Sequence, residues 1–264
     1  MPLAERPGVG IAAITFACTF GGAMAATFVR GWLPPTHLSK ESQDVVRLGI
    51  GLVATMTALL LGLVTASARS TFDMHDAAVR NSAVVILTLD RHLARYGPET
   101  KPTRDLIQQA LAFRVKTLWS ESRDGTAVGP GVAGVNGSST VAPVEEVENQ
   151  ILRLTPETDT QRWLKSEALK LSQEISKTRW RILEAVDGAI PAAFLVAVIF
   201  WLTVTFTSFG LYAPRNATVV LVLFIAAVSV SVAVLLLLEL ATPFTGIIKV
   251  SSAPLQFALE NVNR

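Results

Sequence analysis

The sequence predicts an all-α fold, a four-span transmembrane helical bundle with long cytoplasmic helical extensions. Half of the 264 residues are hydrophobic, and the mean hydropathy is +0.45. Charge is concentrated in the middle of the chain, where residues 69–181 hold 16 of the 23 Lys and Arg and residues 73–187 hold 16 of the 21 Asp and Glu. Outside that region lie four long stretches without a charged side chain, a pattern typical of membrane-spanning helices.

Each charge-free stretch is long enough to cross a bilayer. The stretches are residues 7–29, 48–68, 188–214 and 216–238, with lengths of 23, 21, 27 and 23 residues. A hydrocarbon core about 30 Å thick needs roughly 20 helical residues, and a backbone in lipid must bond to itself. We therefore predict spans at about 8–30, 47–68, 189–212 and 217–241, which form two transmembrane hairpins within residues 1–68 and 188–241.

The first stretch has an alternative interpretation as a cleaved signal peptide, because Ala23-Met24-Ala25 resembles a small-residue cleavage site. Its apolar run is longer than a usual signal core, and the leader before it carries both an Arg and a Glu. We therefore expect this stretch to be retained as the first span.

The distribution of basic residues predicts the orientation. With four spans, both termini and residues 69–187 lie on one face of the membrane. Near the membrane that face carries Arg6, Arg69, Arg80, Lys170, Lys177, Arg179, Arg181 and Lys249, and the other carries Arg30, Lys40, Arg47 and Arg215. Since basic residues favour the cytoplasmic side, we expect an inner (plasma) membrane protein with both termini, the 69–187 helical region and the 242–264 tail in the cytoplasm.

The second helix should continue well beyond the membrane. No Pro occurs between Thr36 and Gly97, so residues 46–96 can form one helix. At 1.5 Å per residue this helix would be about 76 Å long, and about 45 Å of it would lie outside the bilayer.

One face of this helix carries a stripe of small and hydroxyl-bearing residues. Its members, separated by three or four residues, are Gly51, Thr55, Ala58, Gly62, Thr65 and, at the end of the span, Arg69. Two interpretations remain open. Small residues let helices pack closely without any ligand. Alternatively, the stripe borders a water-filled axis in a homo-oligomer, with hydroxyls along the path and Arg69 at its inner mouth.

Charged residues extend the stripe and supply candidate inner-mouth charges. Beyond the span the same face continues with Asp73, Asp76 and Arg80, and the second and third of these can pair at i,i+4. Glu239 ends the fourth charge-free stretch. It either marks the cytoplasmic end of that helix or pairs with a cation such as Arg69 at similar depth.

The cytoplasmic region should be mainly helical. Helices are expected at about 103–119 and 157–187, and the second can pass directly into the third span because no breaker precedes Gly188. Between them, residues 124–143 are rich in Gly and predict a flexible loop. No Gly-Lys-Ser/Thr follows, so this is not a phosphate-binding loop.

The sequence offers no catalytic or metal-binding motif. Cys18 is the only cysteine, which excludes an intrachain disulfide and a thiolate metal cluster. The three His residues are dispersed, and no Walker, HExxH or Gly-x-Ser-x-Gly motif is present. We expect no enzyme, no metal and no cofactor. The net charge of +2 does not indicate a nucleic-acid partner, so the expected partners are the lipid bilayer, other copies of the chain and ions.

Three segments taken in order carry a resemblance to a known family. They are LGLVTASARSTFD (residues 61–73) with AVR (78–80), FGLYAPRN (209–216), and PFTG (243–246) with Val250-Ser251 and the closing helix. This order resembles the bestrophin-like family of bacterial multi-pass membrane proteins of unknown function. The resemblance implies four spans with cytoplasmic extensions and, by analogy with bestrophin channels, a ring of subunits around an ion path lined by the second helix.

The stripe departs from what the analogy implies. Bestrophins carry aromatic and aliphatic neck residues on that helix, whereas this one has Gly, Thr and Ala. Only the location of the pathway is therefore carried over. Two functional hypotheses follow: a homo-oligomeric ion channel, or a non-conducting membrane scaffold or sensor whose cytoplasmic bundle binds a protein partner.

Overall fold

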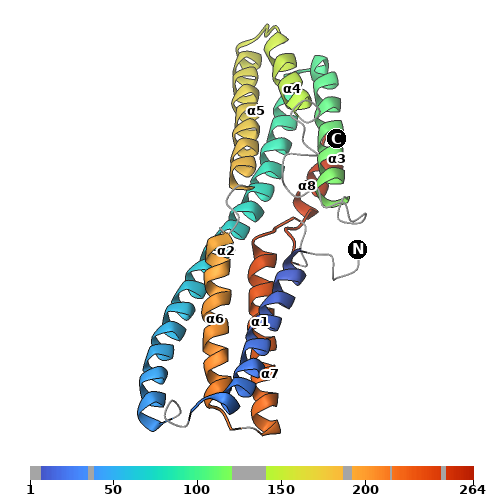
Figure 1. The fold of residues 1–264 in the computed structure, drawn as a ribbon. Helices are drawn as coiled ribbons and strands as arrows, with labels where there is room; N and C mark the ends of the chain where they lie inside the picture. The colour runs from blue at the N-terminus through green and yellow to red at the C-terminus, as the bar shows by residue number, and fades with distance from the viewer. Residues whose placement is uncertain (1–6, 35–38, 121–140, 187–191, 215, 245–247) are drawn as a thin grey trace. The chain divides into compact units, whose positions relative to one another are not determined.

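The structure, a computed structural model, describes residues 7–34, 39–120, 141–186, 192–214, 216–244 and 248–264. Every regular element in these ranges is a helix, which confirms the all-α prediction (Figure 1). The α-helices are α1 (Pro7–Val29), α2 (Lys40–Tyr96), α3 (Lys101–Ser120), α4 (Val141–Arg153), α5 (Asp159–Val186), α6 (Ala192–Tyr212), α7 (Ala217–Leu240) and α8 (Ala253–Asn261), and the 3₁₀ turns are η2 (Arg30–Trp32) and η4 (Pro98–Thr100).

The chain divides into two units. Unit 1 comprises Met1–Ser70 and Ile190–Ala241, and unit 2 comprises Thr71–Ala189 and Thr242–Arg264. Helix α2 is continuous and contributes to both, as its lack of internal Pro predicts. The expected Gly-rich loop falls mainly on residues outside the described ranges, as does the expected passage of the 157–187 helix into the third span.

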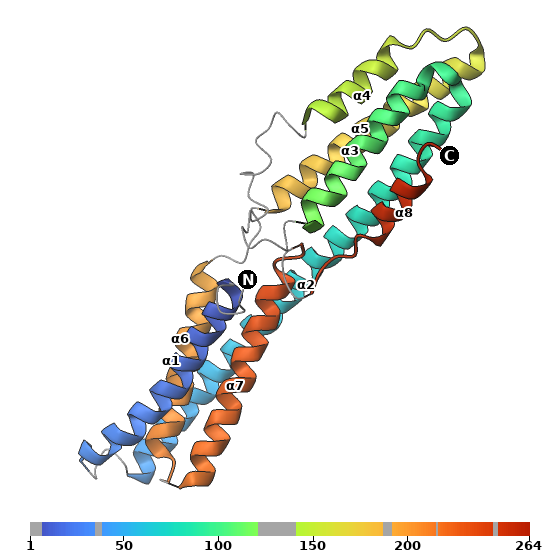
Figure 2. The ribbon, with the colours of Figure 1, turned by 90° about the vertical axis from the view of Figure 1, so that its right-hand side faces the viewer.

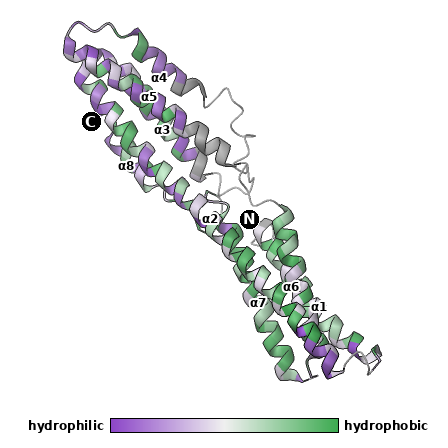
Figure 3. Cartoon of the chain, turned by 90° about the vertical axis from the view of Figure 1, so that its left-hand side faces the viewer, coloured by the Kyte–Doolittle hydropathy of each residue, from purple (hydrophilic) through white to green (hydrophobic). Residues whose placement is uncertain are grey.

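Unit 1 is a membrane-type bundle. Four helices of the described chain, α1, α2, α6 and α7, are long and apolar enough to span a bilayer. Their apolar colouring in Figure 3 covers most of α1, α6 and α7 and the part of α2 that follows its polar first turns. The four-span prediction is therefore confirmed, and the chain is a helical membrane protein.

Helix α1 packs tightly against α6 along a seam of small residues. A Cβ added to Gly210 of α6 would lie 2.0 Å from the main-chain oxygen of Ala23, and one added to Gly22 of α1 would lie 2.7 Å from Oγ1 of Thr207. Ala23 and Ala26 are buried on the same face of α1. Glycine at these positions lets the two backbones approach, the main source of packing energy between helices in lipid.

Hydroxyl groups in this bundle are satisfied within their own helices. Thr15 and Thr19 are fully buried, and each donates to the main-chain oxygen four residues earlier, at 2.9 and 2.8 Å. Such bonds remove the cost of placing a hydroxyl in an apolar environment. Three phenyl rings join α1 to α7, because Phe16 and Phe20 each meet Phe224 edge-on at 5.6 Å.

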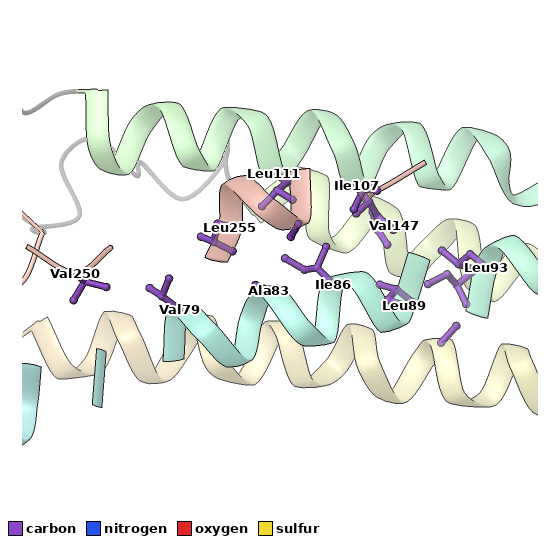
Figure 4. Close-up of a cluster of buried hydrophobic side chains, with 14 of the residues drawn as sticks. Val79, Ala83, Ile86, Leu89, Leu93, Ile107, Leu111, Val147, Val250 and Leu255 are labelled. Atoms are coloured by element: carbon purple, nitrogen blue, oxygen red, sulfur yellow. The ribbon is translucent and has the colours of Figure 1, made fainter. Parts of the chain in front are cut away.

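Unit 2 is a bundle of helices around its own apolar core (Figures 2 and 4). Helix α2 supplies Val79, Ala83, Ile86, Leu89 and Leu93, which recur every three or four residues and so share one face. Facing helices, and the segments on either side of α8, add the remaining core side chains. Those labelled in Figure 4 include Ile107 and Leu111 of α3, Val147 of α4 and Leu255 of α8.

The segment between α7 and α8 is held to this core by aromatic contacts. Phe244 is buried and meets the rings of His75 and Trp119 edge-on, at 5.5 and 6.0 Å. The indole Nε1 of Trp119 also donates to the main-chain oxygen of Val250 at 2.9 Å. Because His75 is buried, desolvation lowers the pKa of its imidazole, which therefore favours the neutral form.

Candidate functional site: the exposed stripe of α2

The stripe on α2 faces away from the rest of its own chain. Gly51, Thr55, Ala58, Gly62, Thr65 and Arg69 are all exposed. In the most apolar stretch of α2 only 6% of the residues are buried, whereas 17–22% are buried in the corresponding stretches of α1, α6 and α7. Unlike α1, the spanning part of α2 therefore has most of its surface available to lipid, water or another copy of the chain.

A different face of α2 makes the contacts within unit 1. Thr57 and Ala68 are buried, and Leu61 and Val64 line a small apolar pocket together with side chains of α6 and α7. These positions also recur at intervals of three and four residues, so they form a second face of the helix. The stripe lies on neither this face nor the face of large apolar residues at Leu52, Met56, Leu59 and Leu63.

The glycines of the stripe have open space around them. Across the described residues, no atom outside their own helix lies within 4 Å of a Cβ added to Gly51 or Gly62. This contrasts with Gly22 and Gly210, where the added atom would clash. The small residues of α2 therefore do not serve packing within one chain, and the stripe is open to lipid, to another copy of the chain or to a water-filled pathway.

The hydroxyls of the stripe already have acceptors. Thr55 donates to the main-chain oxygen of Gly51 at 2.8 Å, and Thr65 donates to that of Leu61 at 2.7 Å. Each hydroxyl proton is thus satisfied in the helix, and what it presents outward is an oxygen with free lone pairs and a methyl group. Within the span the stripe is a narrow, mildly polar surface with no fixed charge until Arg69.

Charged side chains follow the span on the same helix. Arg69 and Asp73 are exposed, and Arg80 bonds Asp76 at 2.9 Å, as the i,i+4 spacing predicts. An exposed pair of this kind contributes only a few tenths of a kcal/mol, about 0.3 to 0.5. The Asp76–Arg80 pair therefore contributes more to the local electrostatic field than to stability.

Glu239 lies in the last turn of α7, one residue before the helix ends. It is buried there, and its Oε1 is 4.0 Å from a Cβ added to Gly8 of α1. An acid buried against a neighbouring helix belongs to the interior of unit 1.

The described residues hold no group of three or more His, Cys, Asp and Glu side chains placed to bind a metal ion. Two of the three histidines lie on α2, where His75 packs on Phe244 and His92 meets the ring of Trp163 edge-on at 5.5 Å. The third, His37, lies outside the described residues.

Two features escaped the sequence reasoning. The first is the α1–α6 seam, for which a signal existed, because Gly22 and Ala26 have the small-xxx-small spacing of helix contacts. The second is Asp90, which is fully buried and bonded by Arg104. The sequence does place Asp90 on the apolar face of a helix, between Ile86 and Leu93, which indicates burial. Nothing in the spacing indicated that Arg104 is its partner.

Comparison with known proteins adds independent findings. A protein-family model described as a Bestrophin-like domain matches residues 17–255. No curated protein matches. Among solved structures, a bacterial bestrophin homologue from Klebsiella pneumoniae, carrying a point mutation, superimposes with a TM-score of 0.59 at 18% sequence identity, and the match covers 95% of this chain and 97% of that one. At this identity the structural likeness concerns the fold.

Proposed function

The chain belongs to the bestrophin-like family, and from this premise we propose that it forms a homo-oligomeric ion channel in which α2 of each copy borders the pathway. The observation that carries the proposal is the exposure of the whole stripe, while the packing of the same chain uses other faces. A mildly polar surface facing lipid would gain nothing, whereas around a shared axis it would face water.

The arrangement around an axis follows from the three faces of α2. One face contacts α6 and α7 of the same chain, the stripe faces the axis, and the Leu and Met face meets lipid or the neighbouring copy. Closed rings of identical subunits are the common form of such assemblies. One copy cannot enclose a path with a single helix, so the proposed site is complete only in the oligomer.

The charges beyond the span supply the electrostatics of the proposed inner mouth. Arg69 ends the stripe, and a ring of Arg side chains would raise the local concentration of anions. Asp73 on the same face would oppose this effect, so the balance between these two positions sets which ions enter. Within the span the Thr oxygens and small residues would let ions pass with much of their hydration retained.

We place unit 2 and both termini in the cytoplasm and the protein in the inner membrane. Eight basic residues near the membrane on that face against four on the other support this orientation.

Reconstitution tests the proposal directly. Purified protein in planar bilayers should conduct above empty membranes, and Arg69→Ala should change the ratio of anion to cation permeability more than Arg47→Ala at the other end of α2. The absence of any current over a range of voltage, calcium and anion conditions would refute conduction.

One observation favours a second candidate, a non-conducting scaffold or sensor whose unit 2 binds a protein. Unit 2 exposes large apolar side chains, among them Val84, Trp163 and Phe257 at 61%, 55% and 61%. In mild detergent this candidate predicts recovery of a specific second protein that is lost on Trp163→Ala, together with absence of current. Recovery of the chain alone would contradict it.

A further inference from the structure

A second polar network lies in unit 2, apart from the stripe. There α2 and α3 hold the end of α8 and the three residues that follow it, residues 261–264. The contacts fall into two groups, those to the main chain of the segment and those to the side chain of Asn263.

The main-chain contacts hold the backbone of a segment that turns away from the end of α8. The carboxylate of Asp90 accepts the N–H of Asn263, with nitrogen to oxygen distances of 3.3 and 3.4 Å. The guanidinium of Arg91 donates to the main-chain oxygens of Asn261 and Arg264 at 3.3 and 2.9 Å. Bonds of this kind hold a segment whatever its side chains are.

Three side chains of α3 form hydrogen bonds with the side chain of Asn263. Its Nδ2 donates to Oδ1 of Asp105 at 2.6 Å and to Oε1 of Gln108 at 3.1 Å, and its Oδ1 accepts from Nζ of Lys101 at 3.0 Å. Both donors and the acceptor of the amide are therefore used, which an Asp or a Leu could not reproduce. Asn263 also adopts φ +72°, a left-handed conformation that Asn tolerates better than most residues.

The charged groups of the site have partners other than the segment. Asp90 is fully buried, but Arg104 binds both of its oxygens, at 2.7 and 3.1 Å. The carboxylate of Asp90 therefore keeps Arg104 as its partner when residues 261–264 leave. Departure of the segment leaves no uncompensated buried charge. Lys101 and Asp105 also pair with each other at 3.2 Å, and their side chains are 56% and 45% exposed, so water can replace Asn263 there.

We propose that α2 and α3 form a peptide-recognition site, occupied in this structure by residues 261–264 of the same chain, which act as a latch that opens while the helices stay folded. The ligand class is a short peptide with an apolar residue, an Asn and a basic residue in succession, here Val262, Asn263 and Arg264. Val262 inserts into the apolar core, and Asn263 provides the specificity. The proposal does not depend on ion conduction.

A peptide-binding experiment tests it with the full-length protein in detergent and a variant that ends at residue 260. A fluorescent peptide of residues 261–264 should bind the shortened protein, in which those positions are empty, at least about tenfold more tightly than the intact protein, whose site is occupied. Changing Asn263→Ala in the peptide should lose at least about tenfold in affinity. Asn261→Ala is the matched control, because its side chain bonds only to Phe257 of its own helix. Equal binding of all three peptides, or no binding to a folded shortened protein, would overturn the proposal.

Hydrogen exchange on the intact chain decides the question if the shortened protein does not fold. The amide of Asn263 should exchange much faster than the amides of residues 86–93 in α2, and Asn263→Ala should raise exchange at residues 262–264 without changing α2. Exchange of the segment and of α2 at the same rate would mean that the latch opens only on global unfolding, which would overturn the proposal.

Discussion

Small residues produce opposite surfaces in two parts of unit 1. Along the α1–α6 seam, Gly22, Ala23 and Gly210 bring two backbones so close that an added methyl group would clash. Along α2, Gly51 and Gly62 have open space beside them. Both are small-residue faces of apolar helices, so composition does not separate them. What separates them is whether the described chain supplies a partner helix for that face, and for the stripe of α2 it does not. This difference is the physical basis for assigning the open face a role in the assembly.

The largest expected effect is at the closed seam. Gly210→Leu should prevent folding of unit 1, since the added atoms would overlap the main-chain oxygen of Ala23, which cannot move aside as a flexible side chain can. Overpacking of this kind should cost at least about 3 kcal/mol. The measurement is the thermal unfolding midpoint in detergent, with the fraction of monodisperse protein. Gly62→Leu is the matched control and should fold as the unchanged protein does. A Gly210→Leu protein of unchanged stability would break the comparison.

The next effect concerns the open stripe. Thr55→Leu and Gly62→Leu should each reduce single-channel conductance, by roughly tenfold if the side chains narrow and dewet the pathway. Leu59→Ala, on the large apolar face of the same helix, should leave it close to normal. If Leu59→Ala lowers conductance as much as Thr55→Leu does, the stripe has no special relation to the pathway.

A smaller effect sharpens the contrast within α1. Gly22→Ala should destabilise the protein by about 1 kcal/mol, because the new methyl group meets the side-chain hydroxyl of Thr207 rather than backbone. Its neighbour Gly21 has no atom of another described residue within 4 Å, and Gly21→Ala should be neutral or stabilising by up to about 1 kcal/mol through helix propensity. Equal unfolding midpoints for the two variants would contradict a seam on only one face.

The same contrast between closed and open faces extends to unit 2 and predicts its pH dependence. His75 lies on the buried face of α2, and burial holds the pKa of its imidazole below the usual 6.5. The unfolded chain therefore binds this proton more readily, so stability is complete above about pH 6.5 and falls as the pH drops through and below that value. The loss should not exceed about 1.4 kcal/mol per pH unit for one proton. Unfolding midpoints between pH 5 and 8 measure it.

Two substitutions test whether the pH dependence of stability comes from the buried face of α2 or from its exposed face. His75→Leu should flatten the pH dependence, whereas Asp76→Asn on the exposed face should leave it unchanged, since Asp76 pairs with Arg80 at the surface. A pH dependence that survives His75→Leu would assign it to another group.

The sequence was enough to predict the helices and the stripe, but it did not indicate which helix each face packs against. The spans followed from charge-free length, and the single long α2 from the lack of Pro, because both are local properties of the chain. The stripe followed from helical periodicity, and its residues do share one exposed face. Which helix each face meets depends on contacts between distant segments. That is why the approach of Gly210 to Ala23 and the bond of Asp90 to Arg104 could not be inferred.

The central claim is that the stripe of α2 faces water in the assembled protein. The most direct test places single cysteines along residues 51–65 in a Cys18→Ser background and measures their reaction with a membrane-impermeant thiol reagent in sealed vesicles. The account predicts reaction at 51, 55, 58, 62 and 65 and protection at 52, 56, 59 and 63. Protection at all nine positions, or reaction without this helical period, would contradict it.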